Sequence, residues 1–169
     1  MMYQYLSMRK KEELKMTNAN EQVYKAIELA ARYHKECVDW NGSPSIFHVL
    51  RVMFSVTPQT YKYQCAAVLH DILEDTNCTE IELSMYFDKD IVDAVKLLTH
   101  SKHGDNHAGV YLEYVDSIIN SKNKIAIAVK KADLLDNMSG TRVEPDRIDD
   151  HVRCYKKHIK ALCKILSLD

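Results

Sequence analysis

The sequence predicts an all-α fold in a single domain, and three observations support this. Only four Gly and three Pro occur in 169 residues, whereas a β-sandwich or barrel needs many Gly- and Pro-rich turns. Apolar residues recur at helical spacing along most of the chain, without internal repeats or low-complexity segments. The length suits one domain that buries its own core. We predict an N-terminal arm over residues 1–16 and the domain over 17–169.

The first predicted helices follow the polar, Lys-rich arm. Asn18 is a candidate N-cap, with Glu21 three residues later, for a helix that carries an apolar face from Val23 onwards. The segment 41–44 has the sequence Asn-Gly-Ser-Pro and predicts a loop, because Gly permits unusual backbone angles and Pro fixes φ. Further helices are predicted over residues 46–54 and 61–75.

The second half of the chain continues the helical pattern. Thr79 and Glu82 form a candidate capping box, and the next helix covers residues 91–98. Residues 100–109 form a predicted polar loop, followed by a helical stripe and a largely buried helix over 123–138. Gly140 is its predicted C-terminal stop. In the last predicted helix, six apolar residues hold the helical period for five turns; they are Ile148, Val152, Tyr155, Ile159, Leu162 and Leu166.

Charge and cysteine content exclude several classes of protein. The chain has 23 Lys and Arg against 24 Asp and Glu, so it lacks the basic excess typical of nucleic-acid binders. No apolar run approaches the ~20 residues of a membrane helix, and no secretory signal is present at the N-terminus. The five Cys lack CxxC spacing, which favours reduced thiols and a cytoplasmic location.

The segment 66–76 contains the strongest chemical signal. In a helix, four polar residues of this segment share one sector, opposite an apolar sector; they are His70, Asp71, Glu74 and Asp75. A solvated polar face is the simplest interpretation. However, three carboxylates within two turns, with no Lys or Arg between them, repel one another. A bound cation would remove this repulsion, so we consider a metal site.

One ion needs more ligands than His70 and Asp71, and two residues elsewhere are candidates. His48 lies near the start of an apolar helix, where a lone His is more often structural. Asp133 has small or apolar helical neighbours, so its carboxylate must be paired or metal-bound to offset desolvation. Lys130, three residues earlier, is the alternative partner of Asp133.

Together these motifs resemble those of the HD-domain metal phosphohydrolases. The resemblance is carried by Pro44-x-x-x-His48, by the Ala-Ala-Val-Leu-His-Asp-Ile-Leu-Glu-Asp-Thr segment at 66–76, and by Val-Lys-Lys-Ala-Asp-x-x-x-Asn-Met at 129–138. It covers about residues 20–165. Within this group the chain is most similar to the hydrolase domain of RelA/SpoT proteins, and especially to the single-domain small alarmone hydrolases.

The resemblance implies a helical bundle around one divalent ion, usually Mn²⁺, with other divalent metals as alternatives. It implies that Glu74 and Asp75 orient and deprotonate the attacking water, and that Asn137 lies beside the metal and the substrate ribose. The implied reaction removes the 3′-pyrophosphate of ppGpp or pppGpp, giving GDP or GTP and pyrophosphate. The metal ligands implied by the match are His48, His70, Asp71 and Asp133. A mixed N/O set of this kind suits an octahedral ion.

Several residues depart from the family pattern. Val38 occupies the position of an Arg that packs on the guanine base, Ser45 replaces a Tyr, and Val49 replaces a Pro after His48. None of these positions is a metal ligand, so hydrolysis of a phosphoester is still expected. Which base the site recognises is left open. The alternatives are hydrolysis of adenine alarmones, another nucleotide phosphatase activity of the HD group, and a non-catalytic nucleotide-binding module.

Other candidate residues carry weaker signals. Lys102, Arg142 and Tyr155 are candidate substrate contacts: the family places basic groups near Lys102 and a Tyr near the ribose, whereas Arg142 could instead cap a helix. The last helix also carries three lysines that we interpret as a solvated face; they are Lys156, Lys157 and Lys160. The expected partner is a nucleotide, and homo-oligomerisation is an open alternative.

Overall fold

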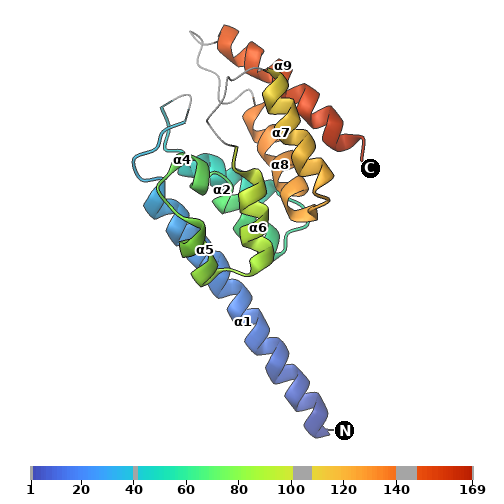
Figure 1. The fold of residues 1–169 in the computed structure, drawn as a ribbon. Helices are drawn as coiled ribbons and strands as arrows, with labels where there is room; N and C mark the ends of the chain where they lie inside the picture. The colour runs from blue at the N-terminus through green and yellow to red at the C-terminus, as the bar shows by residue number, and fades with distance from the viewer. Residues whose placement is uncertain (1, 40–41, 101–107, 140–147, 169) are drawn as a thin grey trace.

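The protein is a bundle of α-helices. The computed structural model describes residues 2–39, 42–100, 108–139 and 148–168. Within these ranges the only β-pairing is an isolated bridge between Val38 and Pro44, so the all-α prediction is confirmed (Figure 1). The helices are α1 (Met2–Tyr33), α2 (Ile46–Ser55), α3 (Tyr61–Leu69), α4 (Ile72–Asp75), α5 (Glu80–Tyr86), α6 (Lys89–Leu98), α7 (Ala108–Asn120), α8 (Lys124–Asn137) and α9 (Ile148–Leu166).

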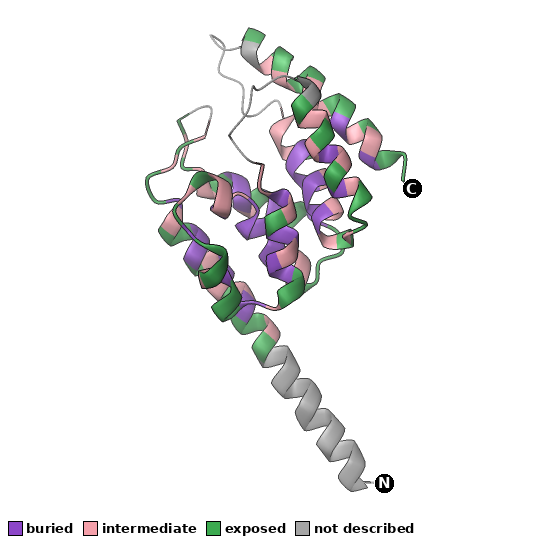
Figure 2. Ribbon diagram, viewed as in Figure 1, coloured by how far each residue is buried: buried purple, intermediate pink, exposed green. Residues whose placement is uncertain are grey.

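Helix α3 lies at the centre of the bundle. It packs against α1, α2, α6 and α8, and its residues 65–69 are completely buried. Ala66 and Ala67 let the neighbouring helices approach closely, while Val68 and Leu69 fill the space between them. Buried residues accordingly concentrate in the middle of the bundle (Figure 2). The C-terminal end of α3 is thereby fixed from several sides, and this is where His70 follows.

Helix α1 differs from the prediction because it does not begin at Asn18. It runs unbroken from Met2 to Tyr33, and its N-terminal half projects away from the bundle (Figure 1). Residues 1–16 are rich in Lys, Glu, Leu and Met, which favour helix, so no residue stops the helix from extending. Asn18 instead accepts a bond from Gln22 one turn later. No described helix, α1 included, has the length and apolarity needed to cross a membrane.

The predicted helix over residues 61–75 is two helices. Helix α3 ends at Leu69 and α4 begins at Ile72, and Asp71 between them has φ −97° and ψ −3°. This backbone region is sparsely populated and is frequent at active sites. The periodicity of the apolar residues continues across the break, which is why the sequence pattern alone indicates one continuous helix.

Two predicted helix starts are confirmed by their caps. The Thr79 hydroxyl accepts a bond from the Glu82 N–H at 3.2 Å, and the Asn123 side chain accepts one from the Ala126 N–H at 3.0 Å. The Glu82 carboxylate does not complete the capping box, because it bonds Arg32 of α1. It therefore ties α5 to α1. The predicted stop at Gly140 lies outside the described residues.

The last predicted helix is confirmed as α9, but most of the apolar residues that hold its helical period are exposed. Val152, Tyr155, Ile159 and Leu166 are each 40–45% exposed. The face that α9 turns toward α7 and α8 instead carries the buried Ala161 and Ile165. Ala161 is small enough for close helix packing, and this rotation also turns Lys157 and His158 toward the pocket described below.

Candidate metal centre and pocket

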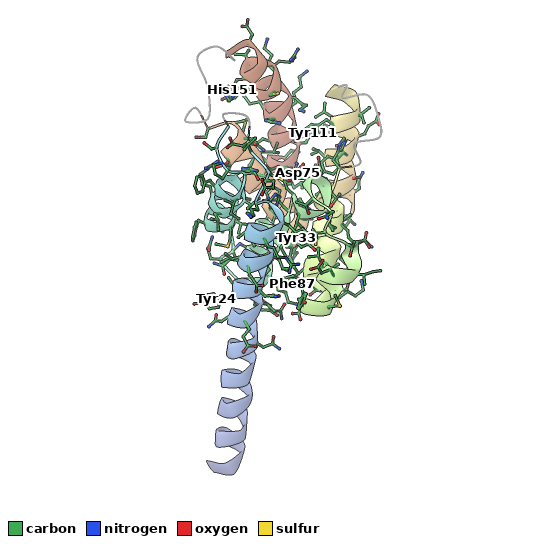
Figure 3. All side chains as sticks on the ribbon, turned by 90° about the vertical axis from the view of Figure 1, so that its left-hand side faces the viewer. Tyr24, Tyr33, Asp75, Phe87, Tyr111 and His151 are labelled. Carbon is green, nitrogen blue, oxygen red and sulfur yellow. The ribbon has the colours of Figure 1, made fainter. Side chains whose placement is uncertain are left out.

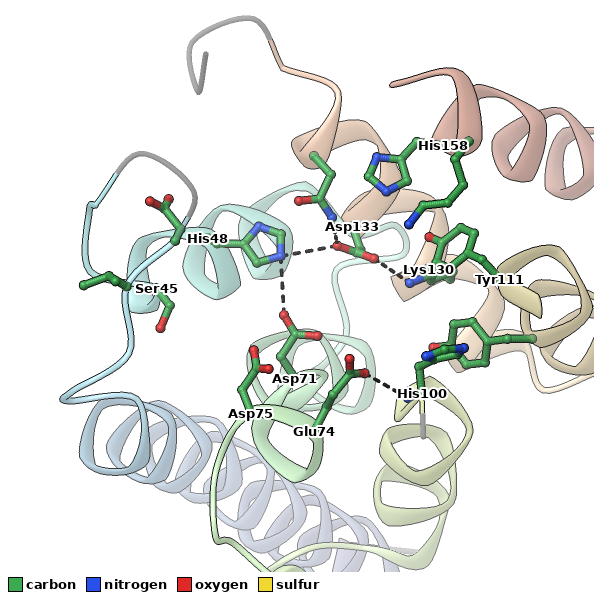
Figure 4. Close-up of a pocket in the computed structure, with 15 residues that line it drawn as sticks. Ser45, His48, Asp71, Glu74, Asp75, His100, Tyr111, Lys130, Asp133 and His158 are labelled. Carbon is green, nitrogen blue, oxygen red and sulfur yellow. Dashed lines mark hydrogen bonds and ion pairs between the residues drawn. The ribbon is translucent and has the colours of Figure 1, made fainter. Parts of the chain in front are cut away.

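Three separate parts of the chain bring four potential metal ligands together. His48 comes from the first turn of α2, His70 and Asp71 from the α3–α4 junction, and Asp133 from α8. His48 Nε2 lies 3.6 Å from Asp71 Oδ2 and 3.3 Å from Asp133 Oδ1. His70 Nε2 lies 3.1 and 3.7 Å from the same two oxygens. Figure 4 shows His48, Asp71 and Asp133 converging on one point.

These separations suit a single octahedral ion. With metal–ligand bonds of about 2.1 Å, neighbouring ligand atoms in an octahedron are about 3 Å apart. Ligand atoms of His48, His70 and Asp71 lie within 4.8 Å of one another, and Asp133 Oδ1 is close to both imidazoles. The four atoms can therefore occupy part of one coordination shell and leave other positions for water and substrate.

The break between α3 and α4 makes two consecutive residues face the same point. In an unbroken helix, successive side chains diverge by about 100°. Here the turn at His70 and Asp71 ends α3, and the Asp71 carbonyl accepts the first bond of α4 from Asp75 N–H at 2.9 Å. The two side chains consequently end with His70 Nε2 and Asp71 Oδ2 only 3.1 Å apart.

The His70 ring is oriented for metal binding. Its Nδ1 lies 2.7 Å from the Ala67 carbonyl oxygen, and because a carbonyl only accepts, Nδ1 carries the proton. The neutral ring therefore keeps its lone pair on Nε2, which is buried and has no hydrogen-bond partner of good geometry in the described chain. An inward-facing nitrogen of this kind fits a divalent cation.

A hydrogen-bonded carboxylate orients His48 from behind. His48 Nδ1 lies 2.7 Å from Asp136 Oδ2, and Asp136 also accepts bonds of 2.7 and 3.1 Å from Arg51 Nε and Nη2. Burial disfavours the charged carboxylate, but the bonds from His48 and Arg51 outweigh it and lower the pKa of Asp136 to about 2. The sequence analysis missed Asp136 and Arg51, although Asp136 follows Asp133 by three residues on the same helix.

Asp133 divides its two oxygens between a lysine and the proposed metal. Lys130 Nζ lies 2.8 Å from Oδ2, so the predicted alternative partner is present, while Oδ1 faces the two histidines. Burial opposes ionisation of Asp133, but Lys130 and the histidines hold its pKa well below the usual range. Asn137 donates to Oδ1 from the next turn. The carboxylate is therefore ionised and held in place.

The electrostatic balance of the cluster also favours a cation. Although burial disfavours their charged forms, the nearby carboxylates raise the pKa of both His48 and His70. A proton and a divalent ion therefore compete for the same ring nitrogens. Binding of a divalent ion is thus expected to release protons and to strengthen as pH rises.

Glu74 and Asp75 extend from α4 beside the ligand set (Figure 4). Glu74 Oε2 accepts a bond of 2.9 Å from the His100 backbone N–H, which fixes its direction. Burial, helped by repulsion from Asp71 and Asp75, raises the pKa of Glu74. A carboxylate with a raised pKa is a better proton acceptor, so Glu74 suits a general base. Asp75 lines the same pocket but is exposed.

Three of the four potential ligands, His48, Asp71 and Asp133, border a pocket of about 400 Å³. Carboxylates line one side, whereas Lys130, Tyr111 and His100 lie on the other, with His158 above them (Figure 4). Figure 3 shows Asp75 and Tyr111 in the half of the molecule that is farther from the N-terminus. The pocket thus combines an acidic, metal-binding side with a basic and aromatic side, as a phosphorylated ligand requires.

Comparisons with known proteins find similar hydrolases, although no family model matches the chain. The chain is 33% identical over 148 residues to a probable guanosine-3′,5′-bis(diphosphate) 3′-pyrophosphohydrolase of Mycoplasma genitalium, covering 78% of this chain and 20% of that protein. It is 28% identical over 136 residues to the Borreliella burgdorferi guanosine-3′,5′-bis(diphosphate) 3′-pyrophosphohydrolase, with 77% and 20% coverage. The chain therefore spans about a fifth of the length of these curated relatives.

A solved structure supports the fold. It is described as a metazoan orthologue of SpoT that hydrolyses ppGpp, and it matches with a TM-score of 0.61 and 24% identity over 83% of this chain and 85% of that one. The resemblance to RelA/SpoT-type HD-domain hydrolases is confirmed. The described part of the chain has the all-α HD-domain fold.

The remaining predicted contacts of the RelA/SpoT-type site have different outcomes. Asn137 lines the pocket, as do Val38 and Ser45, the positions that depart from the family pattern. Tyr155 is 40% exposed beside His151 and does not line the pocket. Lys102 and Arg142 lie outside the described residues, and their roles stay predictions.

Proposed function

We propose that this chain hydrolyses the 3′-pyrophosphate of ppGpp and pppGpp, giving GDP or GTP and pyrophosphate. The observation that carries the proposal is the convergence of His48, His70, Asp71 and Asp133 on one point, with Glu74 and Asp75 beside it. The relatives named as guanosine-3′,5′-bis(diphosphate) 3′-pyrophosphohydrolases support the choice of substrate.

We propose Mn²⁺ as the ion. Two imidazoles and two carboxylates form a mixed N/O set that suits this metal, with Mg²⁺ and other divalent ions as competitors. When bound, the ion supplies positive charge that polarises the phosphate oxygens and lowers the pKa of a water molecule.

The side chains then serve one hydrolytic step. The oxygen of a water molecule forms a bond to the phosphorus attached to O3′, and the bond between that phosphorus and O3′ breaks. Glu74 accepts a proton from the water, and O3′ takes up a proton as the ribose hydroxyl of GDP or GTP is released. Asp75 orients the water from the exposed side of the pocket, and Asn137 holds the Asp133 carboxylate. The second product is pyrophosphate.

An adenine alarmone is the second candidate substrate, because two residues that line the pocket depart from the family pattern. Val38 and Ser45 line it where family members have Arg and Tyr, and Val38 is 67% exposed. Neither side chain offers a planar cation or ring on which guanine could stack. The base is therefore selected less strictly here than an Arg–guanine stack would achieve, and (p)ppApp fits the same catalytic groups.

A product assay tests the proposal. Metal-free protein is reconstituted with Mn²⁺ and incubated with ppGpp and ppApp side by side, and pyrophosphate and monophosphate release are both measured. We expect pyrophosphate as the product, loss of activity with EDTA, and recovery with added Mn²⁺. Asp71→Asn is expected to abolish turnover, whereas Asp90→Asn on the surface of α6 is the matched control. Release of monophosphate alone, or binding without turnover, would refute the proposal.

A further inference from the structure

Lys157 is a pocket lysine that no described carboxylate neutralises. It lines the pocket together with His48, Asp71 and Asp133 and is only partly exposed. Lys156 and Lys160 on the same helix are exposed and do not line this pocket; they border a neighbouring hollow, which Lys157 also borders. The interpretation of these three lysines as one solvated face is therefore wrong for Lys157. The rotation of α9 that exposes Tyr155 and Ile159 is what turns Lys157 inward.

Two ammonium groups lie near the same aromatic ring. Lys157 Nζ lies 4.2 Å from the centroid of the Tyr111 ring, and Lys130 Nζ lies 5.4 Å from the same centroid. Lys130 is compensated by Asp133 at 2.8 Å, but Lys157 is not compensated by any described carboxylate. Burial and the charge of Lys130 lower the pKa of Lys157. A bound anion would compensate this charge.

A second group near Lys157 also lacks a partner. His158 follows it on α9 and lines the same pocket, and its Nδ1 is buried without a hydrogen-bond partner in the described chain. Burial lowers the pKa of His158 to about 4, so the ring is neutral at pH 7 and offers one N–H donor and one acceptor. A phosphate oxygen could accept from such a ring while the ammonium supplies the charge.

We propose that Lys157 binds the terminal phosphate of the 3′-pyrophosphate, an inference that rests on the proposed function. Lys157 shares the Tyr111 ring with Lys130, and Lys130 bonds a metal-ligand carboxylate. Lys157 is therefore beside the point where the attacked phosphorus would lie. The terminal phosphate, which one bridging oxygen joins to the attacked phosphate, is the group that reaches Lys157. Lys157 then selects 3′-diphosphates over 3′-monophosphates and stabilises the negative charge of the pyrophosphoryl group that water attacks.

Steady-state kinetics on the Mn²⁺-loaded protein test this contact. We compare Lys157→Met, Lys157→Arg and the surface control Lys160→Met, using ppGpp and a guanosine 3′-diphosphate that lacks 5′-phosphates. Loss of a charge-assisted hydrogen bond corresponds to a fall of about 10- to 100-fold in kcat/KM. We expect this fall in Lys157→Met with both substrates, near-normal values in the other two variants, and a matching rise in the inhibition constant of inorganic pyrophosphate.

Two results would overturn the proposal: unchanged kinetics in a folded Lys157→Met variant, or a loss that disappears when the 5′-phosphates are absent. The latter would place Lys157 at the 5′ end of the substrate. If the wild-type protein hydrolyses neither substrate, the proposed function fails first. Calorimetric titration with inorganic pyrophosphate then still decides the anion site, because equal affinities in the wild-type protein and Lys157→Met would exclude it.

Discussion

Replacing Asp136 by Asn removes the carboxylate that orients His48 while keeping the size of the side chain. In the native protein, Oδ2 accepts from His48 Nδ1 at 2.7 Å, and both oxygens accept from Arg51. An amide has one accepting oxygen and one donating nitrogen, so it cannot satisfy His48 and Arg51 together. One donor then faces another donor, or the His48 ring rotates away from the position that points Nε2 at the metal.

The size of the expected loss in metal affinity follows from the role of such hydrogen-bond partners in metal sites. Loss of the hydrogen-bond partner behind a ligating His weakens metal affinity by about 10- to 100-fold, or about 1.4–2.7 kcal/mol. Arg51→Met is expected to have a smaller effect, because the Arg51 side chain is 44% exposed and exposed ion pairs contribute about 0.2–1 kcal/mol. Asp90→Asn is the matched control, since Asp90 pairs with Lys62 on the surface.

The assay is competition for Mn²⁺ between the protein and a chelator at pH 7, with circular dichroism to confirm folding. Long-range ¹⁵N–¹H NMR on the metal-free protein gives an independent measure, because it reports which nitrogen of His48 carries the proton. We expect affinity to decrease in the order Asp90→Asn, Arg51→Met, Asp136→Asn, with the His48 tautomer disturbed only in the last. A folded Asp136→Asn variant that binds Mn²⁺ within twofold of the wild-type protein would refute the reasoning.

Two further predictions concern stability. Leu29→Ala is expected to lower the free energy of unfolding by about 3 kcal/mol, because Leu29 is completely buried; Ile81→Ala, at a site 77% exposed, should change it by less than about 0.5 kcal/mol in urea denaturation. Burial lowers the pKa of His158 from the ordinary value of about 6.5 to about 4, so between these pH values the unfolded chain binds a proton that the folded chain does not. The wild-type protein should therefore lose more stability than His158→Gln as pH falls from 6.5 to 4.

Local signals in the sequence indicate His70, Asp71 and Asp133 as candidate ligands, and the family resemblance completes the predicted set with His48. His70 and Asp71 lie within one polar segment, and the small and apolar neighbours of Asp133 make an unpaired carboxylate there costly. The break after Leu69 could not be predicted, since the apolar period continues through it. The break nonetheless decides whether His70 and Asp71 face one ion or diverge.

Contacts between distant segments explain the residues that were missed. Arg51 and Asp136 are 85 residues apart in the chain, and no periodicity connects α2 with α8. The inward face of α9 could not be predicted either, because the hydrophobic stripe is the usual guide to burial. In this chain the packing of Ala161 and Ile165 against α7 and α8 decides the rotation, and the larger apolar residues remain at the surface.

The same charge arrangement occurs twice behind the metal centre. Lys130 bonds one oxygen of Asp133 and leaves the other facing the two histidines. Arg51 bonds Asp136, which in turn holds His48 with its Nε2 directed inward. In each case a cation farther from the centre keeps a largely buried carboxylate ionised at a fixed position, where an unpaired one would take up a proton. Among the described residues no carboxylate pairs with Lys157 in this way, and a bound phosphate is the partner that we propose for it.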